Sequence, residues 1–293
     1  MKAIVKKTDG TYLEEIPKPI MAMEEALIQV VYAWLCRTDL YVSSGKIQTQ
    51  TPLILGHEFS GIVQDINSNT NSDLRIWDKV AIMPILQDKN GYYTQDMLWV
   101  DMNGGFAEFS TVPLSMLYKI SDNMDMQKAA FVEPIASSTA VLDSPINPTM
   151  KGLIQWNSRI SQLTLDIMKL ENLNPNIFSD SDLNNIEDDS YDYIIETFIN
   201  NDNIDNIIRI LKPGGLLILK SRSYFAINIP TAKLVKKDIQ IFSKYYGDFQ
   251  KAIDIASKLN LETLFGEQMT FEEFIKVFQW DNYDESKKLF LKL

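Results

Sequence analysis

The sequence predicts a mixed α/β protein with a β-rich first part and a second part in which strands and helices alternate. Three observations support this fold class. Short apolar, β-branched runs bounded by Gly, Pro or Asp fill most of the chain before residue 120. Pro145 and Pro148 mark a change of pattern. Beyond them, apolar strands alternate with amphipathic helices, which is typical of a parallel sheet with crossover helices.

The elements follow in this order. In the first part we expect strands at 2–7, 11–16, 26–33, 54–66, 75–85, 104–113 and 117–120, the first of them antiparallel, and then helical spacing over 126–142, interrupted by Pro134. In the second part we expect strands at 152–156, 176–180, 191–198, 216–221 and 238–243, and helices at 158–173, 203–213, 249–259 and 271–280, before a final strand at 287–293.

Composition excludes several classes of function. The chain has 293 residues, 45% of them hydrophobic and 23% charged, which is typical of a globular protein with room for two domains. Its net charge of −11 argues against a nucleic-acid partner. No apolar run is long enough to cross a membrane, and the N-terminus does not resemble a signal peptide. A single cysteine allows no internal disulfide, so we expect a cytoplasmic location.

The stretch from Leu35 to Gly61 holds the only cysteine, Cys36, and the only histidine, His57. Each is followed closely by an acid. A thiolate, an imidazole and a carboxylate form a ligand set that suits Zn²⁺, which favours a metal site. Two alternatives remain open: a small buried Cys with a hydrogen-bonded loop His, or a hydrolase with Cys36 as nucleophile and His57 as base.

Several motifs occur in one shared order along the chain: CRTD at 36–39, GHE at 56–58, WDKV at 77–80, GGFAEF at 104–109, VEP at 132–134, YDY at 191–193 with Glu196-Thr197, and LKPGG at 211–215. With these motifs the sequence resembles the zinc-containing medium-chain dehydrogenase/reductases, the group of alcohol, sorbitol, glucose and threonine dehydrogenases. The resemblance covers nearly the whole chain.

The resemblance implies a GroES-like β domain at 1–143, completed by about 266–293, and a Rossmann-type nucleotide domain at 144–265. It implies one catalytic Zn²⁺ per chain, which holds the substrate oxygen while hydride moves between an alcohol carbon and a nicotinamide. The substrate class is a small alcohol, polyol or carbonyl compound.

The resemblance also implies roles for individual residues. The metal ligands would be Cys36, His57, Glu58 and Glu133, with Glu58 exchanging against water or substrate. Thr38 would begin a proton relay, and Asp39 would orient the His57 ring. Trp34, Tyr41, Phe59 and Trp99 are candidates to line a pocket near the metal, although aromatic residues at such spacings are common in a core.

The sequence departs from the family in three places. Residues 84–103 hold no cysteine, which excludes the four-cysteine structural zinc of many members. Trp156, Ser158 and Ser161 replace the three glycines of the G-x-G-x-x-G turn that accepts a pyrophosphate. About one βα unit is missing before Tyr193.

We expect cofactor contacts from Ser158, Arg159, Asp180 and Thr197. If 176–180 is the second strand of the sheet, Asp180 can accept the ribose hydroxyls and favour NAD over NADP; if it is the third, the ribose-binding unit is missing. The alternative to a zinc-dependent oxidoreductase is a repurposed, non-catalytic member with a retained zinc site. We expect a homodimer that pairs through strand 216–221 or 238–243.

Overall fold

The computed structural model describes residues 1–69, 72–88, 92–222, 226–279 and 287–293. Its chain divides into two compact units, which we call the first unit (Met1–Glu133 with Ala256–Leu293) and the second unit (Pro134–Ile255). The sequence places the domain limits near residues 143 and 266, further along the chain than the limits of these two units. Those domain limits stay a prediction. Among the described residues, no helix combines the length and the apolar character needed to cross a membrane.

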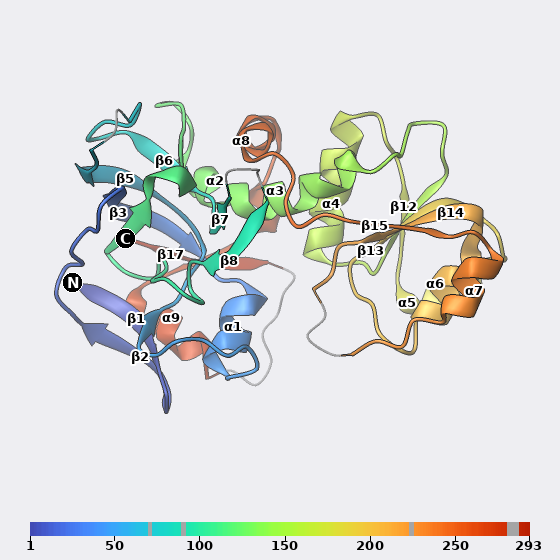
Figure 1. The fold of residues 1–293 in the computed structure, drawn as a ribbon, viewed down its shortest axis with the longest axis horizontal. Helices are drawn as coiled ribbons and strands as arrows, with labels where there is room; N and C mark the ends of the chain where they lie inside the picture. The colour runs from blue at the N-terminus through green and yellow to red at the C-terminus, as the bar shows by residue number, and fades with distance from the viewer. Residues whose placement is uncertain (70–71, 89–91, 223–225, 280–286) are drawn as a thin grey trace. The chain divides into compact units, whose positions relative to one another are not determined.

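The strands of the first unit pair antiparallel, except that β16 and β17 pair in parallel (Figure 1). The small sheet has the order β2-β1-β4, with β1 at Lys2–Lys7, β2 at Gly10–Glu15 and β4 at Leu53–Ile54. The large sheet has the order β10-β6-β5-β3-β17-β16, and β9 also pairs with β3. Its strands are β3 (Glu25–Trp34), β5 (Glu58–Asn67), β6 (Lys79–Ile82), β9 (Phe109–Pro113), β10 (Leu117–Lys119), β16 (Phe265–Met269) and β17 (Lys288–Lys292).

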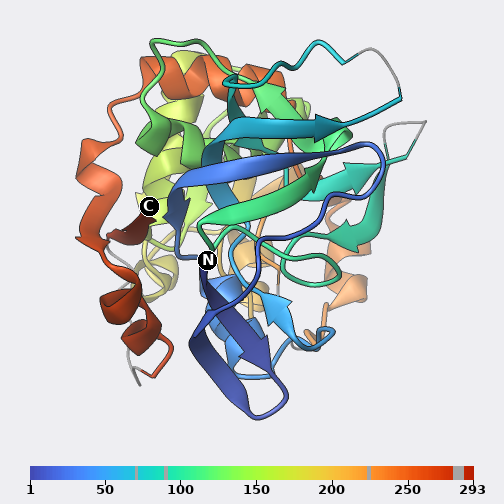
Figure 2. The same cartoon turned by 90° about the vertical axis from the view of Figure 1, so that its left-hand side faces the viewer.

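Short elements complete this unit. They are the pair β7 (Ile85–Gln87) and β8 (Tyr93–Met97), the helices α1 (Arg37–Ser43), α2 (Met126–Ala130) and α9 (Phe271–Val277), and the 3-10 turns η1 (Leu114–Met116) and η3 (Glu262–Leu264). Helix α9 packs beside the β1–β2 hairpin, where Lys2 and Glu272 form an ion pair of 2.6 Å (Figure 2). The last strand, β17, lies between β3 and β16. The end of the chain therefore completes the sheet that the start of the chain begins.

The second unit is a parallel five-stranded sheet in the order β12-β11-β13-β14-β15. Its strands are β11 (Gly152–Gln155), β12 (Asn176–Phe178), β13 (Tyr191–Glu196), β14 (Leu211–Leu219) and β15 (Gln240–Ser243). Its helices are α3 (Val132–Thr139, which begins in the first unit), α4 (Arg159–Leu170), α5 (Asp180–Leu183), α6 (Ile204–Ile210), α7 (Thr231–Lys236) and α8 (Phe249–Lys258, which ends in the first unit), with the 3-10 turn η2 (Ala140–Asp143).

Both faces of this sheet are covered. On one face Ile194 of β13 packs with Ile207 of α6, and on the other Tyr193 and Ile195 pack with Met168 of α4. Alternate side chains of a strand point to opposite faces, so the continuous apolar run of β13 serves two cores. The predicted fold class, a GroES-like β domain with a shortened doubly wound sheet, is confirmed.

The strand order settles one alternative that the sequence leaves open. Strand β12 lies directly beside β11, so residues 176–178 form the second strand of the sheet, and the unit lost from the chain is the one that would follow it. The order also corrects one expectation. Strand β14 pairs with both β13 and β15, so residues 216–219 are not an edge; in the described sheet the edges are β12 and β15.

Candidate metal centre

The pairing of β3 with β5 brings the two ends of the Leu35–Gly61 stretch together. Trp34, the last residue of β3, lies opposite Glu58, the first residue of β5. In an antiparallel pair the register continues backwards along the second strand, so Cys36 comes beside the residues just before Glu58. This is how residues 21 positions apart in sequence, Cys36 and His57, meet without sharing a helix.

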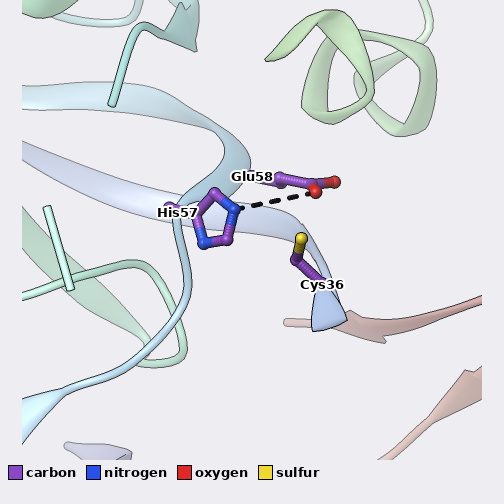
Figure 3. A group of neighbouring side chains, drawn as sticks. All are labelled: Cys36, His57 and Glu58. Carbon is purple, nitrogen blue, oxygen red and sulfur yellow. Dashed lines mark ion pairs between the residues drawn. The ribbon is translucent and has the colours of Figure 1, made fainter. Parts of the chain in front are cut away.

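The donor atoms of Cys36, His57 and Glu58 all lie within 4.8 Å of one another (Figure 3). The His57 Nε2 atom is 3.8 Å from the Glu58 Oε1 atom. His57 and Glu58 are buried, and Cys36 is half-buried. The three side chains point toward one another from a helix N-terminus and a strand start. Among the described residues, this is the group of His, Cys, Asp and Glu whose geometry can hold a metal ion.

Asp39 fixes the orientation of the imidazole. Its Oδ1 atom is 3.1 Å from His57 Nδ1, and both side chains are fully buried. The other oxygen, Oδ2, accepts the Cys36 N–H at 2.9 Å, which ties the start of α1 to the histidine. A neutral imidazole that donates Nδ1–H to a carboxylate presents its Nε2 lone pair on the opposite side. Here that side faces Cys36 and Glu58.

An aromatic ring and two glycine residues surround the His57 side chain and the chain next to it. The Trp99 ring stacks on the His57 ring with centroids 3.8 Å apart. Gly56 has φ +94°, and a Cβ there would lie 2.5 Å from the Phe106 ring. Gly104 approaches so closely that a Cβ on it would lie 2.0 Å from the Gly56 carbonyl oxygen. Glycine is therefore required at both positions for His57 to be held where it is.

The structure adds a residue that the sequence reasoning missed, Lys288. Its side chain is only 1% exposed, and its Nζ atom forms an ion pair with Glu58 Oε2. Strand β17 brings it there, because Phe290 pairs with Trp34 and the Leu35 N–H donates to the Leu289 carbonyl at 3.0 Å. The local sequence gives no sign of this role, because Lys288 is one of two lysines that flank the apolar residues of β17. Its partner lies 230 positions away, which no local pattern reveals.

The charges of this group shift two pKa values. Burial alone would lower the pKa of His57, but the carboxylate of Asp39 and the side chain of Cys36 outweigh it and hold that pKa well above its usual range. Burial raises the pKa of Glu58; Lys288 opposes the rise and the neighbouring Glu133 adds to it. Without a metal, His57 therefore favours its protonated form, and Glu58 has the Lys288 ammonium as its positive partner.

The other predicted residues lie at various distances from this group. Glu133 is buried in the first turn of α3, close enough for its charge to affect Glu58 but outside the group of three. The Thr38 hydroxyl is 3.6 Å from Cys36 Sγ. Of the four aromatic candidates, Trp99 contacts His57, whereas Trp34 packs among Phe131, Phe265 and Phe290 in the core.

The donor set fits zinc. A thiolate, a neutral imidazole and a carboxylate are the usual ligands of Zn²⁺, and catalytic sites combine three protein ligands with an open position. The Asp39 contact to the second imidazole nitrogen is the outer-shell feature expected of such a site. Metal binding would require a deprotonated Cys36 and a neutral His57, so it would release protons.

The predicted nucleotide turn between β11 and α4 is closed by its own side chains. The Ser158 Oγ atom accepts the Ser161 N–H at 3.2 Å and so caps the helix. The Ser161 hydroxyl is hydrogen-bonded to the Trp156 carbonyl and lies 2.9 Å from the Thr197 hydroxyl. Thr197 in turn donates to the Gln155 carbonyl at 2.7 Å.

This turn does not fit a pyrophosphate in the usual way. In the glycine turn the N–H groups at the helix start are left for the phosphates, whereas here the Ser158 side chain takes one of them. Trp156 keeps the left-handed backbone of the first glycine, with φ +73°, and its exposed ring lies 4.9 Å from the Phe198 ring, centroid to centroid. Arg159 begins α4, and Asp180 begins α5 directly after β12, although its side chain lies outside the described part of the chain.

Comparisons with known proteins agree with this geometry. Residues 22–122 match the alcohol dehydrogenase GroES-like domain. L-threonine 3-dehydrogenase of Bacillus subtilis (strain 168) is 32% identical over 161 residues, 49% of this chain and 46% of that protein. Galactitol 1-phosphate 5-dehydrogenase of Escherichia coli (strain K12) is 31% identical over 147 residues, 46% of this chain and 42% of that protein. These matches span less than half the length of each relative.

Similarity of fold extends further. A structure described as a zinc-binding dehydrogenase of Sinorhizobium meliloti 1021, bound to NADP, superposes with a TM-score of 0.90 at 18% identity and covers 100% of this chain and 99% of that one. The matched motifs, the domain match and the shared fold agree with one another. These findings agree with the predicted family: residues 22–122 match the alcohol dehydrogenase GroES-like domain, and over its whole length the chain shares the fold of that zinc-binding dehydrogenase.

Proposed function

We propose that this protein is a zinc-dependent oxidoreductase that interconverts a small alcohol or polyol and the corresponding carbonyl compound, with a nicotinamide nucleotide, NAD rather than NADP, as its redox partner. The observation that carries the proposal is the buried group of Cys36, His57 and Glu58, with donor atoms within 4.8 Å of one another. The named dehydrogenases among its relatives support the reaction class.

In this proposal each residue of the site has a definite task. Cys36, His57 and Glu58 would hold the zinc ion, and Glu133, whose charge acts on Glu58, would be a further ligand, bound directly or through water. A bound zinc supplies Lewis-acid stabilisation of negative charge on an alcohol or carbonyl oxygen. Asp39 keeps the Nε2 atom of His57 directed into the site, and Trp99 keeps the imidazole ring in place by stacking.

Two residues of the site would act during turnover: Thr38 in proton transfer and Glu58 in ligand exchange. The Thr38 hydroxyl lies 3.6 Å from the cysteine sulfur, so it can accept a hydrogen bond from an alcohol held beside that sulfur and pass the proton outward. Glu58 has two alternative positive partners, the Lys288 ammonium and a metal ion. A carboxylate with two partners can leave the metal and return to it when substrate and water exchange.

The test measures metal content and dinucleotide-linked turnover together. Protein purified with zinc should contain about one zinc per chain, and Cys36→Ser and His57→Gln should lose it, whereas Gln64→Ala, at a half-buried position further along β5, should keep it. The wild-type protein with NAD⁺ should oxidise at least one member of a panel of small alcohols and polyols, and EDTA should abolish the reaction. Absence of zinc from the wild-type protein would contradict the proposal.

A second candidate function follows from the closed turn. The hydrogen bond from the Ser161 N–H to the Ser158 hydroxyl uses a donor that a dinucleotide needs, which favours a metal-holding protein that no longer performs hydride transfer. Calorimetry separates the two candidates. Stoichiometric zinc without any binding of NAD(H) or NADP(H) would establish the second and refute the first.

We also propose that the protein forms a homodimer in a reducing, cytoplasmic environment. Strand β15 is an edge of the described sheet, and its Ile241 side chain is 45% exposed. Edge strands with apolar side chains are commonly covered by pairing with a second copy. Light scattering should give twice the chain mass, and Ile241→Lys should give the mass of a single chain.

A further inference from the structure

The indole N–H of Trp99 is a buried hydrogen-bond donor that no described residue accepts. Trp99 is only 2% exposed, and its Nε1 atom has no hydrogen-bond partner in the described part of the chain. An indole nitrogen can only donate, so the group has no other way to be satisfied. Trp34, which is also buried, shows the usual arrangement, because its Nε1–H donates to the Gln127 carbonyl at 3.1 Å. An unpaired buried donor is uncommon in a folded protein and needs a specific explanation.

Trp99 also has an unusual backbone. Its φ is +65°, in the left-handed region that bulky residues rarely adopt. A tight turn holds it there, since the Trp99 N–H donates to the Met102 carbonyl at 2.6 Å and the Leu98 N–H donates to the Pro84 carbonyl at 2.9 Å. Conformations of this kind persist where the surrounding chain enforces them, and they are enriched at binding and active sites. Two separate unfavourable features therefore coincide at one residue.

This residue lies against the candidate metal centre. The Trp99 ring stacks on the His57 imidazole, with centroids 3.8 Å apart and an angle of 26° between the planes. The indole therefore covers a face of the imidazole, whereas the donor atoms of Cys36 and Glu58 gather near its Nε2 edge (Figure 3). The unpaired N–H is thus held close to the three candidate ligands, but to one side of them.

A ligand oxygen is a better partner for this N–H than a water molecule. The Trp99 ring belongs to the apolar cluster of the first unit, and a buried water needs about three polar contacts of its own. A ligand oxygen needs fewer, because the rest of the ligand positions it. The N–H has already lost its water in the folded chain, so an arriving acceptor forms a hydrogen bond without first breaking one to solvent.

We propose that the Trp99 N–H donates a hydrogen bond to a second oxygen of the substrate, on the carbon next to the one that is oxidised. In the proposed function the reacting oxygen lies at the Nε2 edge of His57, so a donor over the face of that ring serves a different oxygen. The substrate class is then a vicinal diol, or in the reverse direction an α-hydroxy carbonyl compound, rather than a simple alcohol. This assignment rests on the proposed function and deepens it, because it makes Trp99 a substrate-binding residue that selects for this class.

The direct test is nuclear magnetic resonance of the full chain with isotope-labelled tryptophan. The chain has five tryptophans, and the indole N–H signal that is lost in Trp99→Phe belongs to Trp99. In the zinc-loaded protein without a nucleotide, at least one of ethylene glycol, propylene glycol and glycerol should move this signal downfield, because a new hydrogen bond deshields the proton. Ethanol and isopropanol should not. A signal that no diol moves, or that the simple alcohols move equally, would overturn the proposal.

The kinetic test compares the same compounds. Trp99→Phe keeps a stacked ring but lacks the N–H, so it should lower the ratio of kcat/KM for the diol to kcat/KM for the simple alcohol about tenfold. The matched control is Trp77→Phe, because Trp77 also has a left-handed backbone, with φ +76°, but its ring is 70% exposed. The control should keep the wild-type ratio. A wild-type ratio in Trp99→Phe would show that the ring acts by stacking alone, which would overturn the proposal.

The two experiments also separate this proposal from the proposed function. The resonance titration needs no turnover, and repeating it with EDTA shows whether the response depends on the metal. Absence of zinc from the wild-type protein would contradict the proposed function, whereas an unresponsive Trp99 signal in zinc-loaded, active protein would contradict only the role of Trp99. If Trp99→Phe fails to fold, single Phe substitutions at the other four tryptophans assign the Trp99 signal by elimination, and the wild-type titration still decides.

Discussion

Two buried residues with opposite charges, Glu58 and Lys288, set the electrostatic character of the metal centre. A buried lysine is costly unless its charge is paired, and a buried glutamate beside Glu133 is costly for the same reason. The ion pair between them offsets both costs. In the proposed chemistry, the Lys288 ammonium is also the partner of the Glu58 carboxylate whenever that carboxylate is not bound to the metal. Lys288 would therefore be a positioning residue.

We predict that Lys288→Met lowers the stability of the metal-free protein by about 3–5 kcal/mol, because it leaves the Glu58 carboxyl buried without its partner. Added zinc should restore more of this stability in the variant than in the wild-type protein, since the metal becomes the remaining positive partner. Thermal unfolding with EDTA and with zinc measures both effects.

Lys292→Met is the control for this prediction, because Lys292 lies on the same strand with an exposed side chain. It should change the stability by less than about 1 kcal/mol in either condition. Equal losses in the two variants would refute the role assigned to Lys288.

A second buried acid, Glu196, gives the second unit a predictable pH dependence. Burial raises the pKa of Glu196 to about 7, although hydrogen bonds from Ser221 and Lys220 oppose the rise. The folded chain therefore holds this proton more tightly than the unfolded chain, in which a glutamate titrates near 4.3. The stability that this proton contributes is fully present below about pH 4.3 and is lost as pH rises through about 7.

We predict that Glu196→Gln removes this pH dependence. From the ordinary value of 4.5 to about 7, at about 1.4 kcal/mol for each pH unit, the wild-type protein should lose roughly 3 kcal/mol relative to the variant between pH 4.5 and 8. Urea unfolding at several pH values measures the difference. A difference that stays constant with pH, or that grows in the opposite direction, would show that Glu196 is not buried as described.

At the scale of elements, the β11–α4 turn keeps the backbone of a dinucleotide turn but not its open surface. Trp156 adopts φ +73°, a conformation that costs a side-chain-bearing residue of order 1–3 kcal/mol. Its ring contacts Phe198, and the two serines form hydrogen bonds that hold the turn closed. The shape of the turn thus survives without glycine because side-chain contacts offset the strain.

We predict that the triple variant Trp156→Gly/Ser158→Gly/Ser161→Gly binds NADH about tenfold or more tightly than the wild-type protein. The substitutions release the N–H groups at the start of α4, and one hydrogen bond to a charged phosphate contributes roughly 1.5–3 kcal/mol. Fluorescence titration with NADH measures the affinity. Asn157→Gly, which changes an exposed residue of the same turn, is the control and should leave the affinity unchanged; equal affinity of the triple variant and the wild-type protein would contradict the prediction.

Helices and strands differ in how well the sequence indicated them. The long amphipathic helix α4 and the apolar strands β11, β13 and β15 were expected within a few residues, because each shows its own periodicity. The short helices α1 and α7 were not, because six or seven residues carry too little periodicity to be recognised. Strand β14 begins at Leu211, where the sequence suggested the end of a helix, since its pairing with β13 outweighs the local pattern.

At the scale of the whole molecule, a first unit that matches the alcohol dehydrogenase GroES-like domain is combined with a five-stranded parallel sheet in the second unit. Strand β12 lies beside β11, so residues 176–178 are the second strand of that sheet. The candidate metal centre draws its residues from the starts of α1, β5 and β17, so it depends on the completed sheet of the first unit.

The sequence by itself determined the fold class and the three candidate ligands Cys36, His57 and Glu58, because periodicity and rare reactive residues are local properties that can be read directly. Only the tertiary structure decided that Lys288 pairs with Glu58, that β14 is internal, and that Ser158 closes the turn. Each of these depends on strand register or on a side-chain hydrogen bond across the fold. Such contacts form between residues distant in sequence, where no periodicity carries a signal.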